Sequence, residues 1–225
     1  MGDGAAMITD TPRPRAPTTP SGPDTLVRDL LQGLAEGRYA PGQRLAEPDL
    51  MTRYRLGRST VREALTRLAA MGIVTQLPHR GAHIRLLSRR AARDVLRVTA
   101  PLLGLAARQA AEAVAAGADP QALRAASQDY DSAVENRARA RARYYRALTS
   151  LAGNAELDRL LPMLQVHLIR AQLRDNRPPG RGARQALVAA VINADPDTAE
   201  AAAHAHIQPL IAALPALPDS LFAPE

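Results

Sequence analysis

The chain has 225 residues, enough for one large domain or for two smaller ones with separate hydrophobic cores. Its formal net charge is +7, every basic side chain is Arg, and aromatic residues make up only 3%. Leu, Ala, Val and Ile must therefore build the core, which favours helices over sheets. The absence of Cys excludes disulfides, Cys-based zinc sites and thiolate nucleophiles. An Arg-rich chain suits nucleic acid, but a GC-rich genome produces the same bias, so charge alone assigns no function.

Residues 1–23 contain Pro, Thr, Gly and Asp in no periodic order and are expected to form a disordered tail, in which Met7 rivals Met1 as the start. No apolar run is long enough to span a bilayer, and the N-terminus lacks the basic-then-apolar pattern of a signal peptide. We therefore expect no membrane association and a cytoplasmic location.

Three helices and a hairpin are predicted for residues 24–87. Leucines at helical spacing predict a first helix over residues 25–37, and two shorter helices are expected at about 47–54 and 58–71. The period then changes, because residues 73–77 and 82–86 are short β-prone runs on either side of Pro78-His79-Arg80-Gly81. Three helices followed by a two-stranded ribbon form a winged helix-turn-helix domain.

The third predicted helix carries two arginines in its first turns. Arg58 and Arg62 are four residues apart and share one face, while the opposite face is apolar: Val61, Ala64, Leu65 and Leu68. Guanidinium groups presented in this way can contact base edges in a DNA major groove. The alternative is a solvated helix face on which Arg62 pairs with Glu63 or Asp49.

Residues 88–225 are predicted to be helical throughout. The expected helices span about 90–116, with a kink at Pro101, and then 120–135, 137–152, 154–175, 183–193 and 196–213. Asp195-Pro196 is typical of an N-cap followed by proline in the first helical turn. We expect a second, all-α domain with its own core, so that the whole protein is mainly α.

The first domain resembles the GntR family of bacterial regulators. The similarity runs through residues 37–47, the stretch 58–68, Met71-Gly72-Ile73-Val74 and the segment 78–81. Gly57 stands where relatives usually have Ser, and Gly is an acceptable N-cap. The resemblance implies that Arg58, Ser59, Thr60 and Arg62 contact operator DNA. It also implies a wing in the minor groove, placed there by His79, Arg80 and Gly81.

The second domain resembles the FCD domain of the FadR-like subfamily, on looser motifs at residues 104–108, 144–148, 151–154 and Asp195 to His206. In that family an Asp and three His often bind a divalent metal, which holds a carboxylate effector. The corresponding positions here are Arg141, Tyr145, Arg184 and His206. Two guanidinium groups repel a dication, so no metal and no other cofactor is expected.

Two interpretations of this altered site remain open. In one, Arg141 and Arg184 replace the charge of the metal and hold an anionic effector such as a small carboxylate, with Tyr145 and His206 as hydrogen-bond donors. In the other, the site is degenerate and binds no ligand. Arginine at every second position of residues 137–143 places basic groups all round a helix, so part of this run must be merely exposed.

The expected function is therefore that of a transcriptional regulator, most simply a repressor, which binds a palindromic operator in double-stranded DNA as a homodimer. An enzyme is the rival from another class, but the chain has no Gly-rich phosphate loop, no Cys and no carboxylate pair in a setting suited to acid–base catalysis. A sequence-independent DNA-packaging protein is a third alternative.

Overall fold

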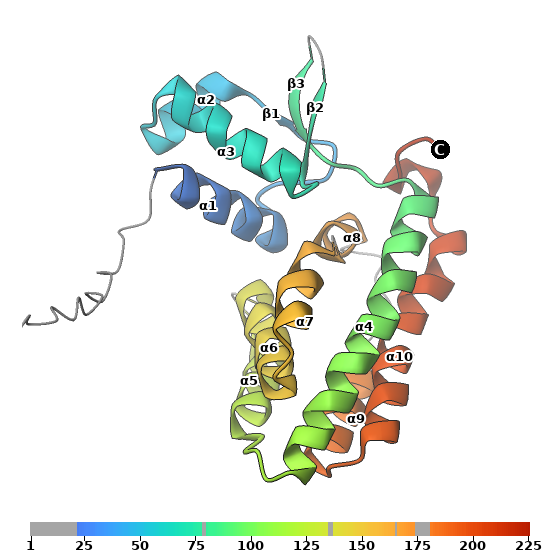
Figure 1. Ribbon diagram of the computed structural model, residues 1–225. Coiled ribbons are helices and arrows are strands. Elements are labelled where there is room, and N and C mark those ends of the chain that lie inside the picture. Colours follow the sequence, from blue (N-terminus) through green and yellow to red (C-terminus); the bar gives the residue numbers. More distant parts are fainter. Residues whose placement is uncertain (1–21, 78–79, 135–136, 165, 174–180) are drawn as a thin grey trace, which may run out of the picture.

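The computed structural model describes residues 22–77, 80–134, 137–164, 166–173 and 181–225, arranged as a small lobe above a longer helical lobe (Figure 1). The small lobe contains α1 (Gly22–Glu36), α2 (Glu47–Tyr54), α3 (Arg58–Ala70) and the strands β1 (Arg44–Leu45), β2 (Val74–Leu77) and β3 (Gly81–Ile84). The helical lobe contains α4 (Arg89–Ala115), α5 (Gln121–Ser132), α6 (Arg137–Ala152), α7 (Ala155–Leu160), α8 (Val166–Gln172), α9 (Arg181–Ile192) and α10 (Pro196–Ala213). Short 3-10 turns lie at Leu161–Met163, Leu214–Ala216 and Asp219–Leu221.

The small lobe has the predicted helices and hairpin, with one addition. The sheet has the antiparallel order β1-β3-β2, in which Arg44 pairs with His83 and Val74 pairs with Ile84. The sequence predicted only the two strands of the ribbon, because a two-residue strand such as β1 has no periodicity to detect. The winged helix-turn-helix class is confirmed.

Local capping sets several helix boundaries in the helical lobe. The Ser88 side chain accepts a hydrogen bond from the Ala91 amide at the start of α4, and Asp195 caps α10 in the same way through Thr198. Pro196 occupies the first turn of α10, as predicted. Helix α4 runs continuously through Pro101, whose side chain is exposed.

The predicted helix over residues 154–175 is interrupted. Pro162 lies in the 3-10 turn between α7 and α8, and proline both removes a backbone donor and clashes with the preceding helical turn. The interruption gives α8 its own direction, so that it packs against α1 of the small lobe as well as α4. The sequence prediction missed this change, although Pro162 is its physical cause.

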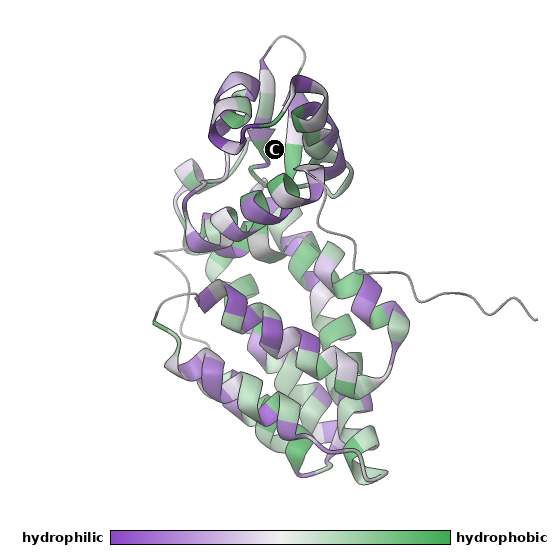
Figure 2. Cartoon of the chain, turned by 90° about the vertical axis from the view of Figure 1, so that its left-hand side faces the viewer, coloured by the Kyte–Doolittle hydropathy of each residue, from purple (hydrophilic) through white to green (hydrophobic). Residues whose placement is uncertain are grey.

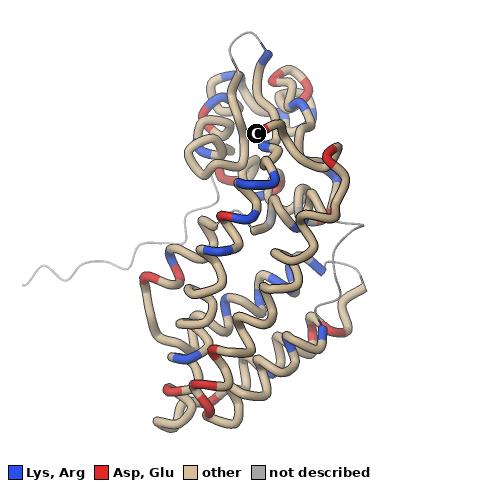
Figure 3. The backbone as a smooth tube through the Cα atoms, turned by 90° about the vertical axis from the view of Figure 1, so that its right-hand side faces the viewer, with Lys and Arg blue, Asp and Glu red and all other residues tan. Residues whose placement is uncertain are grey.

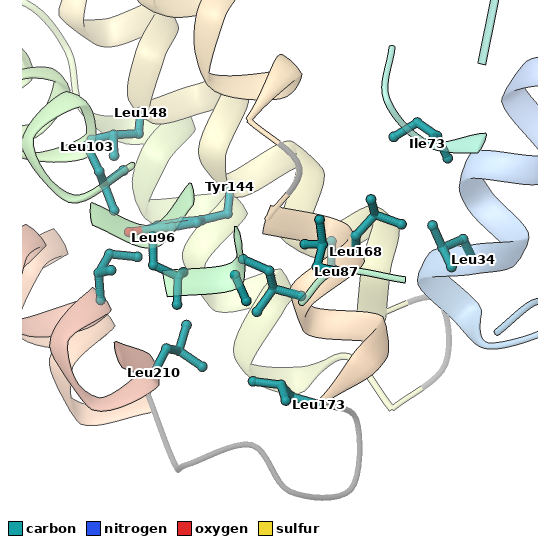
Figure 4. Close-up of a cluster of buried hydrophobic side chains, with 14 of the residues drawn as sticks. Leu34, Ile73, Leu87, Leu96, Leu103, Tyr144, Leu148, Leu168, Leu173 and Leu210 are labelled. Carbon is teal, nitrogen blue, oxygen red and sulfur yellow. The ribbon is translucent and has the colours of Figure 1, made fainter. Parts of the chain in front are cut away.

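The buried apolar side chains form one continuous cluster through both lobes, rather than the two separate cores expected from the sequence. Figure 4 shows Leu34 of α1 and Leu168 of α8 on either side of the place where the lobes meet, beside Leu87 in the linker. Leu96 and Tyr144 continue the cluster into the helical lobe. Hydrophilic and hydrophobic residues are interspersed along the helices of both lobes (Figure 2).

The linker between the lobes is held by side chains from far along the chain. The Gln172 amide accepts a hydrogen bond from the Leu87 amide (3.2 Å) and donates to the carbonyls of Leu87 (3.0 Å) and Leu221 (2.6 Å). Arg89 donates to the Leu217 carbonyl at 2.9 Å, and its guanidinium lies 4.4 Å from the centre of the Phe222 ring. Helix α8 and the C-terminal segment thus fix the exit from the wing.

Candidate DNA-binding surface and effector site

Helix α3 presents its two predicted arginines to solvent. The side chains of Arg58 and Arg62 are 75% and 68% exposed, whereas the apolar face of the helix is buried against the core of the small lobe. Ser59 is also exposed, but Thr60 is half-buried, and its methyl group lies close to Gly22 of α1. Three of the four predicted contact residues are therefore open to a nucleic acid, and the fourth is partly covered.

Glu47, at the start of α2, faces both arginines. Its carboxylate lies 3.5 Å from Arg58 Nε and 3.9 Å from Arg62 Nε. The sequence had suggested Glu63 or Asp49 as partners of Arg62; Glu63 instead pairs with Arg67 at 2.5 Å. Exposed pairs of this kind contribute roughly 0–1 kcal/mol. Such weak pairs leave Arg58 and Arg62 free to exchange Glu47 for phosphate or a base edge.

The wing is described in part. Arg80 is exposed and Gly81 opens β3 with a φ of +80°, a conformation that favours glycine, whereas His79 lies outside the described residues. Arg44 of β1 lies next to Gly81, 3.9 Å from the position that a Cβ would take. Arg44 is thus a further basic group at the base of the wing that sequence reasoning did not single out.

A polar network holds α1 against α2 behind the recognition helix. Arg38 donates to both carboxylate oxygens of Asp29 (3.0 and 3.1 Å), the Tyr54 hydroxyl donates to Asp29, and Tyr39 lies 3.1 Å from Tyr54. The hydrogen bonds from Arg38 outweigh the effect of burial and hold the pKa of Asp29 below its usual value. The network thus fixes the position of α1, the helix against which α3 packs.

Charge is interspersed over both lobes (Figure 3), so the net positive charge does not by itself locate a DNA-binding face. The exposed arginines of α3 and the adjacent wing are the candidates for that face.

In the helical lobe, Arg184 of α9 is almost fully buried, with 3% of its surface exposed. It forms an ion pair with Asp131 of α5, and its guanidinium lies 4.3 Å from the centre of the Tyr130 ring. Burial raises the pKa of Asp131, but the charge of Arg184 and hydrogen bonds from Gln185 and Arg181 outweigh it and hold that pKa below its usual value. Arg184 therefore has a counter-ion within the chain.

Tyr145 of α6 and His206 of α10, both predicted to contact an effector, lie side by side, with 3.0 Å between the Tyr145 hydroxyl and His206 Nε2. The same hydroxyl accepts a hydrogen bond from Arg170 of α8 at 3.0 Å. Arg170 is 8% exposed, and the sequence analysis did not identify it. Its position two residues before the end of a short helix gave no periodic signal.

Tyr144 lies at the centre of this region. It is fully buried and reaches from α6 into the interior of the lobe (Figure 4). Burial raises the pKa of Tyr144, while the charges of Arg184 and Arg170 oppose that rise. The charges of both guanidinium groups therefore favour a lower pKa of the same hydroxyl, that of Tyr144.

Arg141, the remaining predicted residue, is half-buried and lies one helical turn before Tyr145. In the described part of the chain, the buried arginines of the helical lobe are Arg170 and Arg184, and Arg141 is not among them.

The residues of this region do not fit the divalent metal that the resemblance to FCD domains implies. Arg141 and Arg184 offer no lone pair and carry the wrong charge, and His206 Nε2 already lies at hydrogen-bond distance from Tyr145. Within the described ranges, no three His, Cys, Asp or Glu side chains are arranged to hold a metal ion. No helix in those ranges combines the length and apolar character of a membrane span.

Comparison with known proteins agrees with this fold. Residues 24–84 match the sequence model of the bacterial regulatory proteins, gntR family, and residues 94–209 match that of the FCD domain. A curated relative, the HTH-type transcriptional regulator BphR of Paraburkholderia xenovorans, is 42% identical over 66 residues. That match covers 29% of this chain and only 27% of the relative.

Two solved structures resemble nearly the whole chain. A protein of Rhodococcus sp. RHA1 described as a transcriptional regulator GntR has a TM-score of 0.73 at 20% identity, covering 87% of this chain and 98% of its own. McbR/YncC of E. coli has a TM-score of 0.71 at 19% identity with the same coverage. The two family matches, at residues 24–84 and 94–209, show that this chain belongs to the GntR family of bacterial regulatory proteins, with an FCD domain after its DNA-binding domain.

Proposed function

We propose that this protein is a transcriptional repressor that binds a palindromic operator as a homodimer and that responds to a small anionic effector. The observation that carries the DNA-binding part is the exposed pair Arg58 and Arg62 at the start of α3, beside the wing residues Arg80 and Gly81. Arg forks on an exposed helix start suit bidentate recognition of guanine. Acting on chromosomal DNA, the protein would work in the cytoplasm.

The helical lobe offers a surface for a second copy. Val98 and Leu105 of α4 are seven residues apart, lie on one helix face, and are 51% and 38% exposed. Exposed apolar side chains gathered on one face are typical of protein–protein contact surfaces. A two-fold dimer through the helical lobes would place two copies of α3 on two half-sites, and hence predicts a palindrome.

Helix α8 supports a link between effector and DNA. Arg170 of α8 donates a hydrogen bond to Tyr145 in the helical lobe. Two residues later, Gln172 forms hydrogen bonds with the backbone of Leu87, in the linker that follows the wing. An anion that shifts α8 would therefore shift how the helical lobe holds the small lobe, as a change in population between two arrangements.

A ligand-blind regulator is the alternative, and the Arg184–Asp131 ion pair is the observation that favours it. With Asp131 in place, Arg184 needs no anion from outside. The two alternatives therefore differ over Arg170 and not over Arg184.

Selection of operator DNA from a random pool, followed by competition binding at rising salt, tests the DNA-binding proposal. A regulator should prefer one palindrome over random DNA by roughly 10³-fold or more, and binding should weaken as salt rises. A packaging protein would show little preference for any sequence. Analytical ultracentrifugation of the selected complex checks the dimer, and a 1:1 complex of protein with a full palindrome would contradict it.

A further inference from the structure

We propose that Arg89 is a positioning residue that sets, through the C-terminal segment around it, the spacing of operator half-sites that the protein accepts. The proposal rests on the homodimer and palindrome proposed above. The C-terminal segment, residues 214–225, follows α10 and lies beside the linker between the lobes (Figure 1). The Ala223 amide donates to the Leu87 carbonyl at 3.1 Å, and Ala223 pairs with Ser88 in a parallel bridge.

The guanidinium of Arg89 joins several points of the C-terminal segment. It donates hydrogen bonds to the carbonyls of Leu214 and Leu217, the second at 2.9 Å. It donates to the Asp219 carboxylate at 2.5 Å and lies 4.4 Å from the centre of the Phe222 ring, within the range of a cation–π contact. The path of the segment beside the linker therefore depends on this one side chain.

Arg89 is also the first residue of α4, where a positive charge is unfavourable. The N-terminus of a helix carries a partial positive charge, so the helix dipole opposes a cation there. The two carbonyls and the carboxylate of the C-terminal segment compensate the guanidinium. The segment and the start of α4 therefore stabilise each other, and both lie at the point where the chain enters the helical lobe.

The C-terminal segment is held by few buried side chains. Leu214 and Phe222 are buried, while most residues between them are exposed. Gln172 of α8 adds one hydrogen bond, to the Leu221 carbonyl at 2.6 Å. Segments with so little buried apolar surface open at a lower free energy than the whole protein. We therefore expect residues 217–225 to detach while α4 and α10 stay packed.

The attached segment fixes the direction in which the chain passes from the wing into α4. In a homodimer, the two α3 helices must lie at the separation of the two half-sites. A fixed linker holds each small lobe in one orientation and so accepts one spacing, whereas a free linker accepts several. A free linker also weakens binding to the best-spaced operator, because its orientation must then be fixed on binding.

Arg89→Met tests this role, because it removes the charge and the hydrogen bonds but keeps an unbranched apolar side chain. The probes are the selected operator, the same operator with two base pairs inserted at its centre, and an isolated half-site. Since a turn of DNA contains about 10 base pairs, the insertion rotates one half-site by roughly 70°. The unmodified protein should lose at least about tenfold in affinity on insertion, and Arg89→Met about threefold or less.

Half-site affinity separates positioning from damage to the fold. It should be the same in Arg89→Met and the unmodified protein, because a single small lobe needs no spacing. Arg90→Met is the matched control, since the Arg90 side chain is 74% exposed and lies 3.8 Å from Asp94. It should keep the full preference for spacing. An unchanged preference in Arg89→Met, or an equal loss of half-site binding, overturns the proposal.

Phe222→Ala is the second variant, because it frees the C-terminal segment without a change in α4. It should reduce the preference for spacing as Arg89→Met does, and full retention of that preference overturns the proposal. Hydrogen exchange of the Ala223 amide gives a readout without DNA. This amide should exchange faster than that of Leu103, in the buried part of α4, and faster still in Arg89→Met but not in Arg90→Met. Equal protection of Ala223 and Leu103 overturns the local opening.

The outcomes distinguish this proposal from the proposed function. A selected palindrome whose spacing preference survives in Arg89→Met and Phe222→Ala overturns the positioning role and leaves the DNA-binding function standing. Selection of no palindrome overturns the proposed function, and with it the role of Arg89 in spacing. Faster exchange at Ala223 in Arg89→Met then still supports the contact between Arg89 and the C-terminal segment.

Discussion

Arginine occurs in two opposite settings in this protein, exposed on the recognition helix α3 and buried in the helical lobe. On α3, Arg58 and Arg62 are exposed, and each lies 3.5 Å or more from its acidic neighbour. In the helical lobe, Arg170 and Arg184 are buried among tyrosines, and only Arg184 has a counter-ion from the described chain. Water compensates the first pair, so they can bind a polyanion that arrives from outside. The charges of Arg170 and Arg184 must instead be compensated by a carboxylate of the chain or by a bound anion.

Burial, and not residue type, therefore decides what an arginine does in this protein. An exposed ion pair contributes roughly 0–1 kcal/mol, whereas removal of one partner from a buried pair costs about 3–5 kcal/mol. Mutations at the two sites should therefore separate into effects on DNA binding and effects on folding.

Asp131→Asn is expected to have the largest effect. It leaves Arg184 buried without a counter-ion and should lower the free energy of unfolding by about 3–5 kcal/mol, measured by urea titration. Asp129→Asn is the control, because Asp129 pairs with Arg143 on the surface and should cost less than about 1 kcal/mol. Equal losses in the two variants would show that burial does not distinguish these pairs.

The same variant should change the response to acid. The folded pKa of Asp131 lies below its usual value, so its ion pair contributes stability that is fully present above the unfolded pKa of about 3.9 and is lost as the pH falls through the folded pKa. Stability of Asp131→Asn should depend less on pH than that of the unmodified protein between about pH 5 and 3. A parallel pair of curves would contradict the assignment.

Arg62→Ala should weaken operator binding by about 1–3 kcal/mol per half-site with little change in folding, because the side chain is 68% exposed. Fluorescence anisotropy with selected and scrambled DNA measures the loss of selectivity. Arg67→Ala is the control on the same helix, since Arg67 is held by Asp24 and Glu63 on another face. Unchanged selectivity in Arg62→Ala would contradict the placement of α3 in the major groove.

The recognition helix could be predicted from the sequence because its information is local. The spacing of Arg58 and Arg62 and the apolar face opposite them fix a helix and its exposed side, whatever the rest of the chain does. The resemblance to FCD domains assigned Tyr145 and His206 to one site, and in the structure their side chains lie at hydrogen-bond distance from each other.

The buried cluster could not be predicted in the same way. Arg170 enters it only because Pro162 redirects the chain and gives α8 its own axis. The partner of Arg184 lies 53 residues earlier, and its proximity depends on how α5 packs against α9. No periodic pattern in the sequence encodes these contacts.

Gln172→Ala tests the joint between the two regions. The change removes three hydrogen bonds and leaves the Leu87 amide and the Leu221 carbonyl without this partner, so we expect a loss of about 1–2 kcal/mol in the free energy of unfolding. Gln128→Ala, on the exposed face of α5, is the control. Hydrogen exchange at Leu87 should accelerate in Gln172→Ala alone, and no difference between the variants would show that the amide does not hold the linker.

Glu47→Gln should have the smallest effect and the opposite sign. Its carboxylate competes with DNA for Arg58 and Arg62, so its neutralisation should raise operator affinity by up to about fivefold per half-site at low salt, with the gain fading as salt rises. Glu156→Gln removes the same charge from the helical lobe, where Glu156 pairs with Arg159. An equal gain in both variants would assign the effect to net charge. A gain confined to Glu47→Gln would show that Glu47 holds Arg58 and Arg62 by contacts weak enough for DNA to replace them. The buried ion pair of Arg184 with Asp131 cannot be replaced in this way, because Arg184 is not accessible to a polyanion.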